Sequence, residues 1–254
     1  RPSLRFPIVD ADAAASWVVE GSNISETDPT LGEVVVTPFG LKALTTVSNE
    51  LIADSAANAE AAGVVGDGLV RSFARALDSA FFSTSTSNGP GGLGGIDYQT
   101  INVDGAFVNF DPFLQAISQV EQYGSVITGF AASFSTVEQL SQLKRFEATA
   151  TIVSNEPLLA QSPGDVSNPV NRRIFGVPLY SVPESTDSLP TIEDGVVWAI
   201  AADKSFTVLR QDLSVQANPY SAFSSDSTQV RGVMRAAFGF TQPNCVVQIV
   251  SGGS

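Results

Sequence analysis

Several residue types on which enzymes and metal sites depend are scarce or missing in this chain. It has no histidine, and Cys245 is its single cysteine. Without histidine there is no Ser-His-Asp triad, no Cys-His dyad and no His-ligated zinc site. One cysteine allows neither an internal disulfide nor a cysteine cluster that binds metal. We therefore expect no catalytic residues, no metal site and no cofactor.

Charge is also scarce, and most of it is negative. Charged residues make up 15% of the 254 residues, against about 25% in typical soluble domains. There are 13 Lys and Arg against 26 Asp and Glu, which gives a formal net charge of −13. A chain with this charge is a poor candidate for binding nucleic acid, because such binding depends on Lys and Arg that neutralise phosphates. The low charge fits a weakly charged monomer and a chain covered by partners about equally well.

Long apolar runs are absent as well. No run approaches the roughly 18 residues of a membrane-spanning helix, so we expect no membrane partner. Hydrophobic residues nevertheless make up 43% of the chain, and 16 residues are phenylalanine. This content excludes wholesale disorder and is enough for a large core.

The N-terminal part of the chain predicts extended structure. Two early prolines oppose helix formation, so residues 1–15 are predicted to form an irregular, extended arm. Strands are predicted at 17–21, 34–37 and 41–47, with turn chemistry at Asp28-Pro29. Together they would form a long two-stranded hairpin, and the local sequence offers nothing against which the faces of this hairpin could pack.

Helical patterns follow. Ser48 is predicted to cap helical sequence that continues to Asp54. Residues 58–82 carry apolar side chains at steps of four, the pattern of a long amphipathic helix. Three glycines interrupt its first half, where a bend or a close helix approach is expected. The glycine-rich segment 89–95 lacks the lysine of a phosphate-binding loop, and a flexible connector is the favoured interpretation.

The rest of the chain mixes helices and strands without regular alternation. Helices are predicted at 111–123, capped by Asp111, and at 136–145; strands are predicted at 125–133, 174–182, 196–201, 206–210, 230–241 and 245–250. Pro178 favours an edge position for the strand at 174–182. This order predicts an α+β fold rather than a doubly wound sheet.

Few residues in the sequence suggest catalysis or ligand binding. Paired carboxylates can hydrolyse glycosides without histidine, and the local acidic pairs are Asp10 with Asp12, Glu26 with Asp28, and Glu193 with Asp194. Solvated loop acids are the favoured interpretation of these pairs. Cys245 lies in an apolar strand and is predicted to be a small buried hydrophobe. The pairs Arg172-Arg173 and Arg231 with Arg235 are too sparse for a nucleic-acid footprint and favour buried or interface ion pairs.

The segments Trp17–Gly21, Ser25–Thr30 and Ser48–Ser55, taken in this order, resemble tailed-bacteriophage major capsid proteins, which share the HK-ninety-seven-like fold. The order continues with the long helix, the glycine-rich connector, a Gly-x-Pro strand at Gly176–Pro178 and a strand pair near the C-terminus. The resemblance implies an N-terminal arm (1–16), an extended E-loop over a neighbouring subunit (17–47), a peripheral domain with a spine helix (48–108), an axial domain (109–212) and a peripheral return (213–254).

The function implied by this resemblance is that of a major capsid protein. Copies would form hexamers and pentamers of an icosahedral phage head, assembled in the host cytoplasm, enclosing double-stranded DNA without specific binding. Portal, scaffolding and decoration proteins would be further partners. The expected subunit-interface residues are Trp17, Glu20, Glu26, Asp28, Pro29, Glu33, Phe39, Arg231 and Arg235, and the hinge candidates are Gly63, Gly66 and Gly68.

One activity of the family is not expected to carry over. Some members crosslink an E-loop lysine to an asparagine of a neighbour, assisted by a glutamate. The corresponding positions here fall near Glu33, Asp226 and Val233, and no lysine occurs between Trp17 and Gly40. The sequence therefore predicts a non-covalent shell. An encapsulin-type compartment, which shares the fold, and a monomeric carboxylate-dependent hydrolase are the alternatives.

Overall fold

The computed structural model describes residues 3–50, 60–144, 157–162, 171–183 and 191–252. In chain order the strands are β1 (Leu4–Ala11), β2 (Thr30–Val36), β3 (Phe39–Ser48), β4 (Gln99–Val103), β5 (Gly129–Ser133), β6 (Ala160–Ser162), β7 (Asn171–Ile174), β8 (Val177–Val182), β9 (Val196–Ile200), β10 (Ser205–Ala222), β11 (Ser227–Phe240) and β12 (Val246–Ser251). The helices are α2 (Glu60–Phe82), α3 (Asp111–Glu121) and α4 (Phe134–Gln142), with short 3-10 helices η1 (Leu93–Gly95), η2 (Ala202–Lys204), η3 (Phe223–Ser225) and η4 (Pro243–Cys245).

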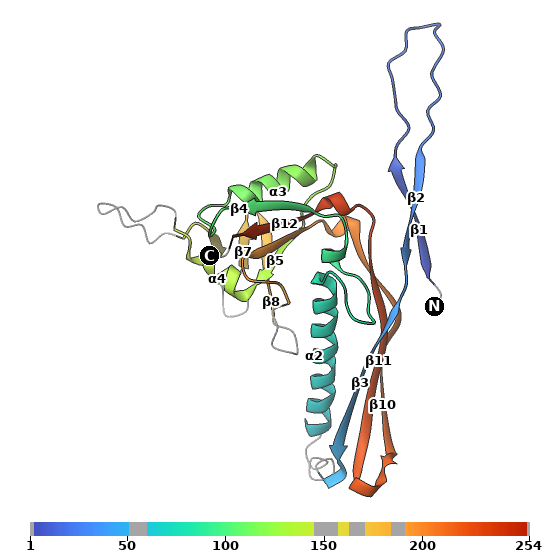
Figure 1. Ribbon diagram of the computed structural model, residues 1–254, viewed down its shortest axis with the longest axis vertical. Helices are drawn as coiled ribbons and strands as arrows, with labels where there is room; N and C mark the ends of the chain where they lie inside the picture. The colour runs from blue at the N-terminus through green and yellow to red at the C-terminus, as the bar shows by residue number, and fades with distance from the viewer. Residues whose placement is uncertain (1–2, 51–59, 145–156, 163–170, 184–190, 253–254) are drawn as a thin grey trace, which may run out of the picture.

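These strands form three separate sheets, and the mixture agrees with the predicted α+β class (Figure 1). β1 and β2 pair as an antiparallel hairpin that projects away from the rest of the molecule. β10, β11 and β3 form a long three-stranded antiparallel sheet. The remaining strands form a seven-stranded mixed sheet in the order β4-β12-β9-β5-β8-β7-β6.

The seven-stranded sheet holds most of the core because both of its faces are covered. Val197 and Ala199 of β9 pack in one cluster with residues of α3 and α4. Trp198, between them, points to the other face and packs with Leu93 of η1 and Phe240 of β11. Burial on both faces explains why the sequence of β9 is continuously apolar rather than alternating.

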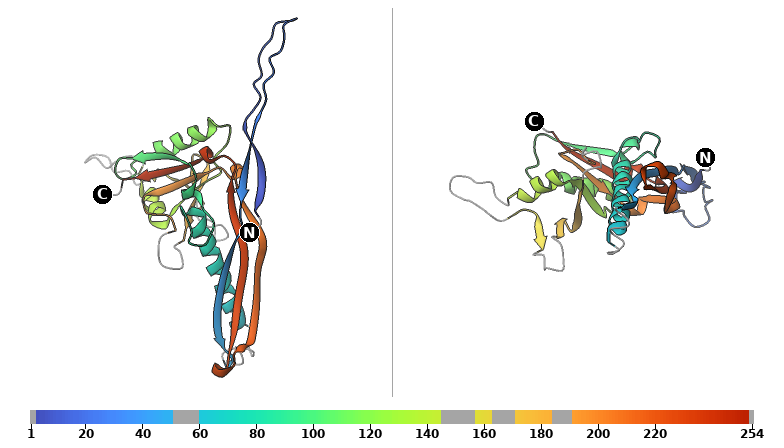
Figure 2. Two further views of the ribbon diagram at one scale, coloured as in Figure 1. Left: turned by 45° about the vertical axis from the view of Figure 1, so that its right-hand side comes forward. Right: turned by 90° about the horizontal axis from the view of Figure 1, so that it is seen from below.

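α2 packs along one face of the three-stranded sheet (Figure 2). Phe73 packs in one cluster with Met234 and Ala236 of β11, and Leu77 packs against this cluster, which confirms the predicted apolar stripe. A Cβ added at Gly232 would lie 2.8 Å from the Phe73 ring, so glycine is needed for this close approach. The helix runs without interruption through the three glycines of its first half. At Gly66 an added Cβ would meet no atom within 4 Å, so no close helix approach occurs there.

The N-terminal expectations need correction. Residues 4–11, predicted to be irregular, form a strand, and residues 17–21, predicted to be a strand, form no regular structure. The chain reverses at residues 19–22 rather than at Asp28-Pro29: the Ser22 N–H donates to the Val19 carbonyl at 3.0 Å, and Gly21 has φ 83°. Residues 41–47, predicted to belong to the returning strand of the projecting hairpin, belong to the three-stranded sheet.

The strand predicted over 174–182 is a hairpin of two strands. Phe175 and Gly176 form its turn, with φ of 51° and 83°, as a tight hairpin turn with two left-handed residues requires. β8 lies between β5 and β7 rather than at an edge. Pro178 is tolerated because the ladder with β5 begins one residue later, at Leu179.

The glycine-rich segment is packed, not a loose connector. A Cβ added at Gly92 would collide with the carbonyl oxygens of Ala80 and Phe81 at the end of α2. Leu93 beside it is fully buried. The glycines therefore allow η1 to lie directly against the helix end, and the prediction of a flexible connector was wrong.

Smaller boundary differences remain. α3 is preceded by Phe110 as its N-cap, with Asp111 already inside the first turn. α4 is capped by Ser133, whose side chain accepts a hydrogen bond from the Thr136 N–H. The cap predicted at Ser48 is supported by a hydrogen bond from the Glu50 N–H to the Ser48 hydroxyl at 3.2 Å. The rest of that predicted helix, residues 51–54, lies outside the described residues.

Candidate assembly surfaces

The hairpin (residues 4–36) contacts the rest of the chain at its base and extends outward from there (Figures 1 and 2). At the base, the Phe6 ring of β1 packs edge-on against Phe206 of β10 with centroids 4.7 Å apart. Glu33 pairs with Arg5 across the two strands at 2.8 Å. Both partners are half exposed or more, so this ion pair contributes at most about 1 kcal/mol.

The outer part of the hairpin, residues 12–29, is named the hairpin loop below. It exposes large apolar side chains. Trp17 has a relative exposure of 105%, Ile24 of 81% and Val19 of 79%. A two-stranded hairpin is marginally stable in water by itself, and exposed apolar groups of this size mark surfaces that bind partners. The hairpin loop therefore has the composition of a binding element, and none of the described residues of its own chain covers it.

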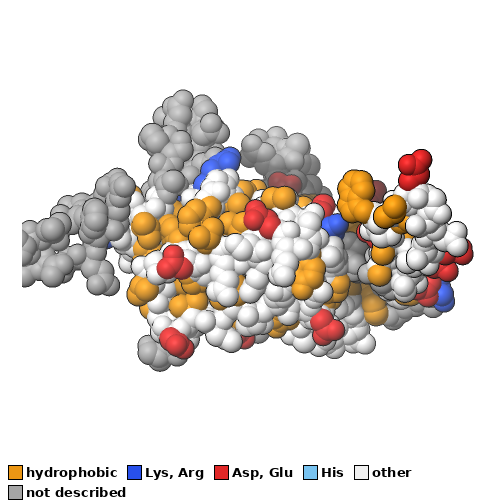
Figure 3. Space-filling view, turned by 90° about the horizontal axis from the view of Figure 1, so that it is seen from above, with side chains coloured by type: hydrophobic (Ala, Val, Ile, Leu, Met, Phe, Trp, Pro, Cys, Tyr) orange, Lys and Arg blue, Asp and Glu red, His pale blue; other side chains and the backbone are white. Residues whose placement is uncertain are grey.

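The hairpin loop is also acidic. Between residues 6 and 41 the chain has six Asp and Glu and no Lys or Arg. Glu20, Glu26 and Asp28 are exposed, as is Pro29. The Thr27 hydroxyl donates to the Ala14 carbonyl at 3.1 Å, which holds the two legs of the loop together near these carboxylates. Seen from above, hydrophobic and acidic side chains are exposed where the hairpin points toward the viewer (right side of Figure 3).

The other predicted interface residues lie on the three-stranded sheet. Arg231 and Arg235 are on the face of β11 that is turned away from α2, because the alternate residues Met234 and Ala236 pack toward the helix. The Arg231 guanidinium donates to the Gln216 amide oxygen of β10 at 2.6 Å. Phe39, half-buried, begins β3 opposite Ala236.

The structure thus separates the predicted interface residues into two groups. The hairpin carries Trp17, Glu20, Glu26, Asp28, Pro29 and Glu33, and the sheet carries Phe39, Arg231 and Arg235. Lys42 was missed by sequence reasoning. It is exposed on β3 opposite Val233, and its place beside the two arginines follows only from the register between β3 and β11.

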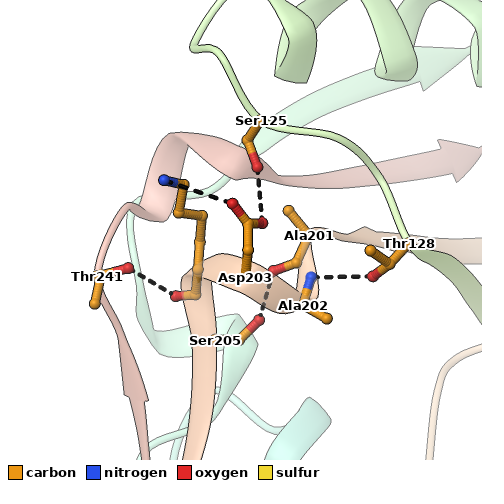
Figure 4. Close-up of polar contacts among 8 residues, drawn as sticks. Ser125, Thr128, Ala201, Ala202, Asp203, Ser205 and Thr241 are labelled. Atoms are coloured by element: carbon orange, nitrogen blue, oxygen red, sulfur yellow. Dashed lines mark hydrogen bonds and ion pairs between the residues drawn. The ribbon is translucent and has the colours of Figure 1, made fainter.

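A cleft of about 670 Å³ separates β1 from the seven-stranded domain. Lys204 forms part of its wall, held by an ion pair with Asp203 at 3.5 Å (Figure 4). Asp203 also accepts a hydrogen bond from the Ser125 hydroxyl at 2.8 Å. These contacts fix the position of the wall.

Cys245 is fully buried, as predicted, and burial raises the pKa of its thiol, so the sulfur stays protonated and behaves as a small hydrophobe.

The described members of the acidic pairs considered for hydrolysis are either exposed or have a structural hydrogen bond, and the side chain of Asp10 lies outside the described part. Asp194 accepts a hydrogen bond from the Ser133 hydroxyl at 2.6 Å, and Ser133 caps α4. Glu26 and Asp28 are exposed on the hairpin loop.

Over the residues that the structure describes, no group of three or more Cys, Asp or Glu side chains gathers in a way that could hold a metal ion. None of the described helices is long and apolar enough to cross a membrane.

Solved structures share this fold over nearly the whole chain. A chain from Gordonia phage Cozz superposes with a TM-score of 0.72 at 15% identity, covering 98% of this chain and 81% of that one. A chain from Mycobacterium phage Adephagia gives a TM-score of 0.72 at 14% identity, covering 99% and 86%. The capsid of an empty GTA particle gives a TM-score of 0.70 at 17% identity, covering 98% and 84%. The chain therefore shares its fold with chains from two phages and with the capsid of a GTA particle.

The sequence places the chain within that class. It matches the model of the phage capsid family over residues 2–250, and the chain belongs to this family. No curated protein matches it by sequence. The family is structural, and the protein is a component of the virion capsid, as the sequence predicted.

Proposed function

We propose that this chain, a major capsid protein of a phage head, assembles without covalent crosslinks into hexamers and pentamers of an icosahedral shell around double-stranded DNA. Membership of the phage capsid family supports the shell role. The absence of lysine between Trp17 and Gly40 supports non-covalent assembly, because an isopeptide bond needs an amine. Portal, scaffolding and decoration proteins complete the proposed set of partners.

The elements of the fold take the following roles in this proposal. The hairpin is the E-loop, α2 is the spine helix, and α2 with the three-stranded sheet forms the peripheral domain. The seven-stranded sheet with α3 and α4 forms the axial domain. β4 and β12 pair within that sheet, so they join the axial domain rather than the peripheral segments to which the sequence assigned them. Gly63, Gly66 and Gly68 remain the proposed hinge of α2.

The observation that supports the proposal most strongly is the exposed apolar surface of the hairpin. Among the described residues, the hairpin loop leaves Trp17, Val19 and Ile24 almost completely exposed. Apolar side chains of this size gathered on one exposed element mark a contact with another protein chain. Much of the described apolar surface lies on the hairpin, where Trp17 and Ile24 contact nothing that would cover them.

Size-exclusion chromatography and negative-stain imaging of the purified chain test this function, with scaffolding protein added if the chain requires it. We expect shells with five-fold and six-fold capsomers, and nuclease-protected DNA in particles from infected cells. A stable species of about 27 kDa under all these conditions would contradict the proposal. Particles filled with protein cargo and free of nucleic acid would support an encapsulin-type compartment instead.

A further inference from the structure

One asparagine of the chain, Asn88, is followed directly by glycine. Asparagine is a thermolabile residue, because its side-chain amide is lost when the backbone nitrogen of the next residue attacks the side-chain carbonyl carbon. Glycine has no Cβ that would obstruct this attack. By contrast, the residues after Asn23 and Asn102 are isoleucine and valine, which are branched at Cβ. The sequence therefore favours this reaction at Asn88 over the other asparagines.

The structure leaves the Asn88 side chain open to water. Asn88 lies in the turn between the end of α2 and η1, and it is exposed. Its backbone is left-handed, with φ 56°, a conformation in which asparagine is enriched. The amide nitrogen donates to the Ser87 hydroxyl at 3.4 Å, which is longer than a normal N–H···O hydrogen bond. The amide is therefore held only loosely.

One contact opposes the reaction. The Gly89 N–H donates to the Thr86 carbonyl at 2.9 Å, and this hydrogen bond must open before the Gly89 nitrogen can attack. Opening of an exposed turn requires far less free energy than unfolding of the whole chain. The hydrogen bond therefore slows the reaction at Asn88 without preventing it.

Asn49 provides an internal reference because both ends of its amide are fixed. Its amide nitrogen donates to Asp226 Oδ1 at 2.7 Å, and its amide oxygen accepts a hydrogen bond from the Thr228 hydroxyl at 2.7 Å. The next residue, Glu50, carries a full side chain, and its N–H donates to the Ser48 hydroxyl at 3.2 Å. Asn49 should therefore keep its amide under conditions in which Asn88 loses it.

We infer that Asn88 is a site of spontaneous deamidation, a covalent modification whose only co-reactant is water. The Gly89 nitrogen forms a bond to the Asn88 side-chain carbonyl carbon and gives up its proton, and the amide nitrogen leaves with that proton as ammonia. Water then opens the resulting five-membered succinimide ring at either carbonyl carbon, which yields aspartate or isoaspartate, and nothing is oxidised or reduced. The product adds a carboxylate, charged at neutral pH, to a chain whose net charge is −13.

The two products should differ in their effect on the fold. Isoaspartate inserts an extra methylene into the backbone next to Gly89, where space is limited: a Cβ added at Gly89 would lie 2.8 Å from the Thr86 Cγ2 methyl group. This product should lower the thermal midpoint. Aspartate keeps the normal backbone, and because the side chain is exposed, it should leave the midpoint close to that of the wild type.

Storage of the purified full chain for several weeks at mildly alkaline pH tests the inference, with peptide mapping by mass spectrometry as the readout. We expect loss of the amide at Asn88, isoaspartate together with aspartate at that position, a more acidic band on isoelectric focusing, and intact Asn49. The matched control is Asn88→Gln, whose longer side chain would have to close a six-membered ring, and it should not develop the acidic band. Asn88→Asp should show that band from the start and keep the wild-type thermal midpoint, which separates the added charge from the lengthened backbone.

Three results would overturn the inference. The first is full retention of the Asn88 amide in the folded chain after storage that converts the same site in the urea-unfolded chain. The second is equal amide loss at Asn49, and the third is an acidic band that also develops in Asn88→Gln. None of these results bears on the shell function, which negative-stain imaging of the same preparation reads independently.

Discussion

Truncation of Trp17 should affect assembly and leave the fold of the single chain unchanged. The indole is fully exposed on the hairpin loop, so Trp17→Ala removes no contact within the chain. Substitutions at such surface positions usually change the free energy of unfolding by less than about 0.5 kcal/mol. We therefore expect the thermal midpoint of the unassembled subunit to match that of the wild type.

In the shell the same substitution should be costly. A tryptophan buries about 150–250 Å², and at about 25 cal/mol per Å² this corresponds to roughly 4–6 kcal/mol for each contact. Ordering of the loop offsets part of that gain, which leaves about 2 kcal/mol or more for a residue at the centre of an interface. A loss of about 2 kcal/mol raises the dissociation constant of the contact roughly 30-fold.

Light scattering against subunit concentration measures this effect, with thermal unfolding of the unassembled subunit alongside. Trp198→Ala is the matched control, because Trp198 is 3% exposed and packs against Tyr98 at 4.8 Å between ring centroids. That variant should lose about 3–5 kcal/mol of folding stability. The reasoning fails if Trp17→Ala assembles at the wild-type concentration, or if it lowers the thermal midpoint of the unassembled subunit.

Three further predictions concern stability and covalent state. Gly232→Ala should destabilise the chain by about 1–3 kcal/mol, because its Cβ would press on the Phe73 ring; urea unfolding measures this, and an unchanged midpoint contradicts it. Partial desolvation on α2 raises the pKa of the Asp78 carboxyl although the residue is still exposed, so its charged form lowers stability by a small amount at pH values above the ordinary carboxyl pKa of about 4. Asp78→Asn should therefore raise the thermal midpoint at pH 7, with a gain that disappears in acid; a gain independent of pH would refute this cause. Purified particles should run as a single band of subunit mass on a denaturing gel, and a ladder of covalent oligomers would show a crosslink that the sequence does not predict.

Strongly periodic segments were predictable from the sequence. Apolar residues spaced four apart, among them Phe73 and Leu77, predicted a helix at 58–82, and α2 spans Glu60–Phe82. The pattern was informative because the helix buries one continuous face. The apolar run of β9 was also recognised, since both of its faces are covered. In both segments local pattern and tertiary packing agree.

Other features depend on partners distant in the sequence. β1 was missed because Pro7 opposes regular structure, yet β1 pairs only with β2 among the described strands and keeps one edge free, where a proline is tolerated. The turn at Phe175 was missed because a left-handed backbone at phenylalanine is unusual. The position of Lys42 beside Arg231 and Arg235 could be known only from the register of β3 against β11.

A cryo-electron microscopy reconstruction of the assembled particle tests the central claim most directly. We predict an icosahedral shell in which the hairpin, residues 4–36, lies on a neighbouring subunit with the Trp17 indole buried in that contact. A reconstruction in which the hairpin remains solvated, or folds back onto its own chain, would contradict this account.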